Sequence, residues 1–233
     1  MNWKEIKISS DNKAYLFQEN QLFGKVFIEA LKFHSPGLAA VKDESGSYHI
    51  DVYGKELYKE RYTRTFGYYC NRASVLENEN SFHLTETGVR AYHTNYLWCG
   101  NFQENICPVR DNKNKYFHID LNGNKLYANK YIYVGDYKDG IACVKTEMGF
   151  YKHIDKHGVF INNRRFLDLG IFHKNHATAR DEKGWHHIDK NGVELYQQRY
   201  LMIEPFYNGF SLVKTFEKDK RIIDEYGKVI LEI

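Results

Sequence analysis

Small apolar residues alternate with other residues along short stretches of this chain, and the alternation recurs every 34 or 35 residues. In six places a small residue is followed two positions later by Val or Ala. The pairs are Ala39 and Val41, Ala73 and Val75, Cys107 and Val109, Ala142 and Val144, Ala177 and Ala179, and Ser211 and Val213. Side chains alternate between the two faces of a strand, so this spacing predicts six short strands that each bury one face.

A residue suited to a tight turn stands two positions before each of these strand pairs. The six residues are Gly37, Asn71, Asn105, Gly140, Asn175 and Gly209. Gly and Asn are the residues that best tolerate a positive φ, so a left-handed turn is predicted at each position. An aromatic residue or His lies three positions earlier, at His34, Tyr68, Phe102, Tyr137, Phe172 and Phe206. We expect these rings to pack between neighbouring repeats.

A second repeated motif is His-Ile-Asp with Gly three residues after the Asp. It occurs at His49, His118, His153 and His187, and in degenerate form at His83 and Ile222. The Asp can accept backbone N–H bonds while the Gly adopts a left-handed conformation, so the motif predicts a hairpin turn. The histidines are interpreted as packed imidazoles, because copies in different repeats cannot reach one ion. No metal site is predicted, and a local site at His186 with His187 is the minor alternative.

Each repeat is interpreted as four short strands, for example Ala177–Asp181, Trp185–Asp189, Val193–Tyr196 and Tyr200–Phe206. The predicted fold is all-β: a single repeat domain over 1–233, with six four-stranded units of ~35 residues. The units start near residues 37, 71, 105, 140, 175 and 209, and residues 1–25 form a partial N-terminal hairpin. We predict a six-bladed β-propeller, closed by the N-terminal strand Val26–Phe33, which completes the last unit. The alternative is an open β-solenoid of stacked hairpins.

With these motifs the chain resembles the WG-repeat proteins of bacteria over roughly residues 35–230. The best match runs from Gly184 to Gly192, with the sequence Gly-Trp-His-His-Ile-Asp-Lys-Asn-Gly. The Trp-Gly dipeptide itself is absent, and the position of its Gly is taken by Tyr48, Phe117, Lys152 and His186. The resemblance implies a repeat scaffold for interactions and carries over no catalytic residue.

Composition narrows the function further. Lys and Arg number 33 against 30 Asp and Glu, a net charge of +3, so nucleic-acid binding is not expected. No apolar run is long enough to span a membrane and no signal peptide is present, so we expect a cytoplasmic monomer. The four cysteines have no metal or disulfide spacing and are expected to be reduced. Neither a P-loop, a Gly-x-Gly-x-x-Gly sequence nor a Gly-x-Ser-x-Gly elbow occurs, so no enzyme activity and no cofactor is predicted.

One set of positions is a candidate for function. A basic residue directly follows the buried Val or Ala in five repeats, at Lys42, Arg110, Lys145, Arg180 and Lys214, with Leu76 as the exception. We call this set the basic register. One interpretation is a basic rim that attracts anions. The other is that the acidic residues that follow directly, Asp43, Asp111 and Asp181, neutralise it as solvated turn residues.

The sequence therefore predicts a non-catalytic interaction module that binds a protein partner, of acidic character, through the basic register. Trp98, in a variable segment, is a further candidate for partner binding. The alternative is a carbohydrate-binding propeller with repeated aromatic sites, which would bind glycans at several equivalent positions.

Overall fold

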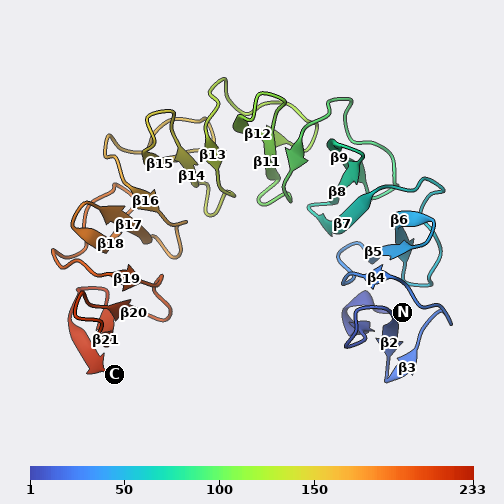
Figure 1. Ribbon diagram of the computed structural model, residues 1–233, viewed down its shortest axis with the longest axis horizontal. Helices are drawn as coiled ribbons and strands as arrows, with labels where there is room; N and C mark the ends of the chain where they lie inside the picture. The colour runs from blue at the N-terminus through green and yellow to red at the C-terminus, as the bar shows by residue number, and fades with distance from the viewer. The chain divides into compact units, whose positions relative to one another are not determined.

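The computed structural model describes residues 1–233, and its regular secondary structure consists almost entirely of short antiparallel strands joined by turns and loops (Figure 1). The one helix is a single 3-10 turn, η1 (Trp3–Glu5). None of the helical structure has the length or the hydrophobicity to cross a lipid bilayer. The chain divides into two compact units, residues 1–114 with 118–125 and residues 115–117 with 126–233. Each unit is described by itself.

The strands form seven small sheets that follow one another along the chain. The first three are β1 (Lys7–Ile8), β2 (Tyr15–Phe17) and β3 (Asn20–Gln21); β4 (Glu29–Ala30), β5 (Leu38–Asp43) and β6 (Gly46–Asp51); and β7 (Arg64–Tyr69), β8 (Arg72–Glu77) and β9 (Asn80–Thr85). The next two are β10 (Trp98–Cys99), β11 (Ile106–Arg110) and β12 (Tyr116–Asp120); and β13 (Tyr133–Val134), β14 (Ala142–Lys145) and β15 (Tyr151–Ile154). The last two are β16 (Asp168–Leu169), β17 (Ala177–Asp181) and β18 (Gly184–Ile188); and β19 (Met202–Ile203), β20 (Phe210–Lys214), β21 (Lys220–Asp224) and β22 (Val229–Glu232).

The first two strands of each predicted repeat are confirmed, whereas the last two differ from the prediction. β17 covers the predicted Ala177–Asp181 and β18 nearly covers the second strand. The third predicted strand makes only the isolated bridge between Ile188 and Glu194. The fourth begins with a bridge back to Trp185 and then becomes β19, which pairs with β20 of the following repeat. Each sheet from β4-β5-β6 onward therefore combines the segment that ends one sequence repeat with the start of the next.

The N-terminal region also differs from the prediction. β4 lies within the segment expected to complete the last unit, but it pairs with β5, where Glu29 lies opposite Lys42. The last sheet takes its fourth strand, β22, from its own repeat. Residues 1–25, predicted as a partial hairpin, supply a separate three-stranded sheet, β1-β2-β3. Backbone pairing at the start of the chain is thus local.

The predicted turns and buried faces are confirmed. The six residues before the central strands all have a positive φ, from +59° at Asn71 to +100° at Gly37. The small residues and the Val or Ala two positions later are all buried, with at most 2% of each residue exposed. At the hairpin after β18, Asp189 Oδ1 accepts hydrogen bonds of 2.8 Å from the backbone N–H groups of Asn191 and Val193. The turn chemistry read from the sequence is the chemistry that the chain uses.

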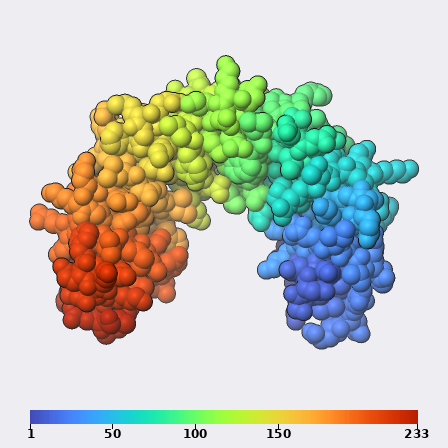
Figure 2. All heavy atoms as spheres, in the orientation of Figure 1, coloured from blue at the N-terminus to red at the C-terminus, as the bar shows by residue number.

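A tyrosine from one repeat packs against the motif glycine of the next. Gly158 has φ +76°, and a Cβ there would lie 2.5 Å from Cγ of Tyr127. The same contact joins Gly88 to Tyr58 and Gly227 to Tyr196. Glycine is therefore required twice at these positions, for the backbone conformation and for the close approach of the ring. Within each unit, the atoms of successive repeats form a continuous surface (Figure 2).

Candidate functional site

The five residues of the basic register are the last or next-to-last residues of the central strands of five sheets, each opposite the short strand that precedes it. Lys42 and Arg180 lie opposite acidic residues, Glu29 and Asp168. The other three lie opposite large apolar residues, in the pairs Arg110 and Trp98, Lys145 and Tyr133, and Lys214 and Met202. Cross-strand neighbours on one face of an antiparallel pair are close enough for their side chains to interact. The register is thus flanked by apolar side chains in three sheets.

The apolar members of these three pairs are exposed. Tyr133 is 46% exposed, and Trp98 and Met202 are each 41% exposed. Lys145 lies on the other side over the ring of Tyr151, with Nζ 5.0 Å from the ring centroid. Trp98 was predicted as a candidate independently of the basic residues, and the structure places it directly across the sheet from Arg110. A cation beside an exposed aromatic or thioether side chain is typical of protein-binding surfaces.

One of the two interpretations of the register was that the acidic residues that follow it neutralise it as solvated turn residues. Asp43 and Asp181 do accept hydrogen bonds from the backbone N–H groups of their turns, but each pairs with a cation outside the register. Asp43 Oδ2 accepts hydrogen bonds of 2.8 Å from both Lys25 Nζ and Tyr48 Oη. Burial raises the pKa of Asp43, but the bonds from Lys25, Ser45 and Tyr48 outweigh it and hold this pKa well below its ordinary value. Asp181 is bound by Arg199 rather than by Arg180. These two carboxylates therefore pair with Lys25 and Arg199 and not with residues of the basic register.

The motif histidines are packed and hydrogen-bonded, as predicted. In the repeats of His49, His83 and His187, Nδ1 lies 2.5 Å from the hydroxyl of a tyrosine nine residues later. Nε2 lies 2.8–2.9 Å from a backbone carbonyl in these three and in His153. A carbonyl only accepts, so Nε2 carries the proton and the tyrosine hydroxyl donates to Nδ1. Burial lowers the pKa of all four to about 4, so they are neutral.

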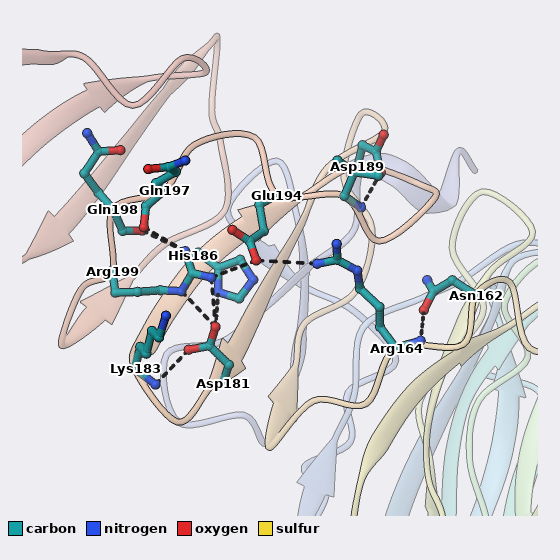
Figure 3. A network of polar contacts seen from close by, with 11 residues as sticks. Asn162, Arg164, Asp181, Lys183, His186, Asp189, Glu194, Gln197, Gln198 and Arg199 are labelled. Carbon is teal, nitrogen blue, oxygen red and sulfur yellow. Dashed lines mark hydrogen bonds and ion pairs between the residues drawn. The ribbon is translucent and has the colours of Figure 1, made fainter.

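A network of polar side chains surrounds His186 on β18 (Figure 3). The sequence named His186 with His187 as a minor alternative for a local site, but the partners of His186 here are Asp181, Glu194 and Arg199. Arg199 donates from Nε and Nη2 to Asp181 Oδ2, at 2.9 and 2.8 Å. Its Nη2 also lies 2.9 Å from Glu194 Oε1. Arg164, from the preceding repeat, reaches Glu194 from the far side at 3.5 Å. Two carboxylates thus share one largely buried guanidinium.

His186 is the unusual member of this network. It is 1% exposed, and neither of its ring nitrogens makes a hydrogen bond. Its Nδ1 lies 4.0 Å from Asp181 Oδ2. Burial and the charge of Arg199 lower the pKa of His186, outweighing the two carboxylates, so the ring is neutral. The same guanidinium outweighs burial at Asp181 and Glu194 and lowers the pKa of both.

The donor set of Asp181, His186 and Glu194 is one that could hold a divalent metal. Their candidate ligand atoms lie within 4.8 Å of one another. Carboxylate and imidazole ligands suit zinc, which takes four ligands at ~2.0–2.2 Å. Arg199, however, bonds to both carboxylates and supplies the positive charge that a metal would bring. The network is therefore complete as an ion-pair cluster, and a metal would have to displace the guanidinium.

A repeat-wise signal could have found this network. Its members lie six and one residues before the motif histidine and seven and twelve residues after it. In the first repeat these positions hold Asp43, Tyr48, Glu56 and Arg61. Arg61 pairs with Glu56 at 2.7 Å and lies 3.9 Å above the centroid of the Tyr48 ring. The motifs found in the sequence recur unchanged from repeat to repeat, whereas the residues at these four positions change together.

No protein-family model matches the sequence, and no curated protein sequence matches it. Solved structures with the same kind of fold do match. A eukaryotic initiation factor aligns with a TM-score of 0.60 at 13% identity, over 98% of this chain and 72% of that one. BamB from Moraxella catarrhalis aligns with a TM-score of 0.52 at 11% identity, over 94% of this chain and 76% of that one. KlHsv2 with loop 6CD replaced by a Gly-Ser linker aligns with a TM-score of 0.51 at 9% identity, over 94% and 91%.

These neighbours are β-propeller proteins, and at such low identity the likeness concerns the fold alone. The class of the chain is therefore an all-β repeat protein, built from small antiparallel sheets of the kind found in propellers.

Proposed function

We propose that this protein is a non-catalytic interaction module that binds an acidic segment of a protein partner. The observation that carries the proposal is the pairing of a basic with an exposed apolar residue at the same position of three sheets, as in Lys145 and Tyr133. A segment that alternates acidic and apolar side chains complements this pattern. Two of the acids that follow the register do not cancel its charge, because Asp43 and Asp181 are bound by Lys25 and Arg199.

The repeat structure suits partner binding because its exposed, variable side chains are held at regular positions by the buried, nearly constant ones. The buried positions of each repeat are nearly constant, and the exposed ends of the strands carry the differences. Repeat proteins use such surfaces for extended contacts with partners. As part of the same proposal, we infer that the protein is related to the WG-repeat proteins and acts in the cytoplasm.

A binding assay with defined peptides tests the function. We would use biolayer interferometry with a synthetic peptide of alternating Glu and Tyr, and the same peptide with Gln in place of Glu as the neutral control. The double variant Lys145→Gln/Lys214→Gln is expected to bind the acidic peptide about tenfold or more weakly, since each charge-assisted contact contributes ~1.5 kcal/mol or more. The matched variant Lys183→Gln/Lys190→Gln removes the same charge from exposed turns and is expected to bind normally.

The outcome also separates the alternative function. Equal binding of the acidic and neutral peptides, or equal weakening by the two double variants, would refute the basic register as the site. A glycan titration that saturates at several equivalent sites would favour the carbohydrate-binding propeller instead.

Closure of the sheets into a six-bladed propeller is the finer, structural part of the proposal. The similarity to propeller proteins supports it. Closure would need a strand other than Val26–Phe33, because β4 is already paired with β5. Small-angle X-ray scattering distinguishes the two arrangements, since a ring has a smaller maximum dimension than an open stack of the same sheets.

A further inference from the structure

The second unit contains a cavity of about 360 Å³ that no member of the basic register lines. Its walls include two cations, three apolar side chains and one amide, from Lys152, Arg165, Phe150, Phe160, Met148 and Asn163. All of these residues belong to one repeat, in β15 and the segments on either side of it. The volume lies in the range of ~300–1,000 Å³ that is usual for small-molecule sites.

Each cation of this cavity is held against an aromatic ring. Lys152 Nζ lies 4.3 Å from the ring centroid of Phe160, and the guanidinium carbon of Arg165 lies 5.7 Å from that of Phe150. Neither cation forms an ion pair with a carboxylate. Burial and the charge of Arg165 lower the pKa of Lys152, so the two positive groups are close enough to repel. Such a pair attracts an anion.

Comparison with other repeats shows what has changed here. The position seven residues after the motif histidine holds Glu56 and Glu194 in two repeats, where each neutralises the arginine twelve residues after the histidine. In the cavity's repeat that position is Phe160. The neutral residue before the histidine, Tyr48 or His186 elsewhere, is here Lys152. Compared with these two repeats, the cavity's repeat has one negative charge fewer and one positive charge more.

The nearby acid does not compensate for this. Glu147 occupies the position that Asp181 holds in the later repeat, but it forms an ion pair with Lys115. The positive charge of the cavity is therefore left for a group from outside the chain.

We propose that this cavity binds a carboxylate carried on an aromatic or aliphatic body. Lys152, Arg165 and the amide of Asn163 provide donors for the carboxylate, and the apolar side chains of Phe150, Phe160 and Met148 contact the body. This site goes beyond the proposed function, because it is a cavity for a small group and shares no residue with the basic register.

Ligand titrations followed by two-dimensional ¹H–¹⁵N NMR test the site. The probe is N-acetylphenylalanine, and its controls are N-acetylphenylalaninamide, which lacks the charge, and acetate, which lacks the apolar body. N-acetylphenylalanine is expected to shift the amides of residues 146–165 and to bind about tenfold or more tightly than either control. Equal affinity of either control, or no shift at ~10 mM probe, would overturn the proposal.

A charge-restoring variant tests the mechanism without removing a cation. Phe160→Glu places an acid where two other repeats have Glu56 and Glu194, and it is expected to pair with Arg165, weakening the probe about tenfold or more. Phe160→Gln is the neutral match, and both are expected to fold because Phe160 is 39% exposed. Loss of binding in Phe160→Glu but not in Phe160→Gln supports the site, and equal binding by the two variants refutes it. Lys190→Gln, at an exposed position that does not line the cavity, is expected to bind like the wild type.

Discussion

The four buried histidines with a lowered pKa predict that the protein loses stability between pH 6.5 and pH 5. His49, His83, His153 and His187 are neutral in the folded protein, with a pKa of about 4 because of burial. In the unfolded chain each has its ordinary pKa of 6.5 and takes up a proton in this range. The unfolded state therefore binds more protons, and the free energy of unfolding falls as the pH falls.

The magnitude follows from the two pKa values. At pH 5 a pKa of about 4 in the folded state and 6.5 in the unfolded state lowers the free energy of unfolding by ~2 kcal/mol for each histidine. Four histidines together remove ~8 kcal/mol, comparable with the whole stability of a typical domain, ~5–15 kcal/mol. Carboxylates with a lowered pKa, such as Asp181, lose their contribution only below about pH 4. Asp136, whose pKa burial raises, acts in the opposite direction but is a single group.

Urea denaturation at pH 7.5, 6.5, 5.5 and 5 measures this effect. Near pH 5.5 these four histidines should contribute the uptake of ~3.5 protons to the slope of the unfolding free energy, ~0.9 for each, and His186, whose pKa is also lowered, adds to it. His157→Gln, at an exposed hairpin position, should leave the slope unchanged. NMR of the imidazole C2–H resonances should show four histidines that do not titrate above pH 5. A constant unfolding free energy from pH 7.5 to 5, or titration of these four rings near pH 6.5, would refute the reasoning.

Three further outcomes are expected. Gly158→Ala should lower the free energy of unfolding by ~3 kcal/mol or more in urea denaturation, because the new Cβ would clash with Tyr127. The control Gly149→Ala, at φ +83° with no atom within 4 Å, should lower it by only ~1–2 kcal/mol through backbone strain. Similar losses in the two variants would contradict the packing argument. Arg199→Met should lower the free energy of unfolding by ~3 kcal/mol, because it leaves Asp181 and Glu194 without their guanidinium partner. Zinc should raise the melting temperature of this variant but not of the wild type, in which Arg199 occupies the carboxylates. No response of the variant to zinc would exclude the three residues as a metal site. Asn162→Tyr should supply the missing hydrogen-bond donor for Nδ1 of His153 and stabilise the protein by ~1 kcal/mol in thermal unfolding. A loss of stability would show that the new hydroxyl does not reach the ring.

The sequence predicted the parts of the fold that depend on local chemistry. The left-handed turns at Gly37 and Asn175, the buried small-x-Val faces and the Asp189 hairpin follow from backbone sterics and period-two alternation, and all are confirmed. The partner of the fourth strand was not predictable in the same way. The segment before Met202 contacts β18, while Met202 itself pairs with the next repeat, and a local pattern does not encode that choice.

The candidate site was predicted only in part. The basic residues and Trp98 were identified from recurrence and composition, and the pairing of Trp98 with Arg110 needed the strand register. The network around His186 was missed because its members are separated by up to 18 residues and no single type recurs at each position. Correlated replacement, such as Phe160 for an acid where Lys152 adds a cation, becomes visible only when positions are known to be in contact.

The offset between sequence repeat and sheet has a consequence for how such a chain could lengthen or shorten. Because each sheet from β4-β5-β6 onward joins the end of one repeat to the start of the next, any internal segment of one repeat length contains each strand of the repeating pattern once, wherever it begins. Duplication or deletion of such a segment at internal positions leaves every tyrosine with a glycine to cover and every strand with a neighbour. A gene for such a protein can gain or lose whole repeats wherever the duplicated or deleted segment begins, provided that the segment is one repeat long.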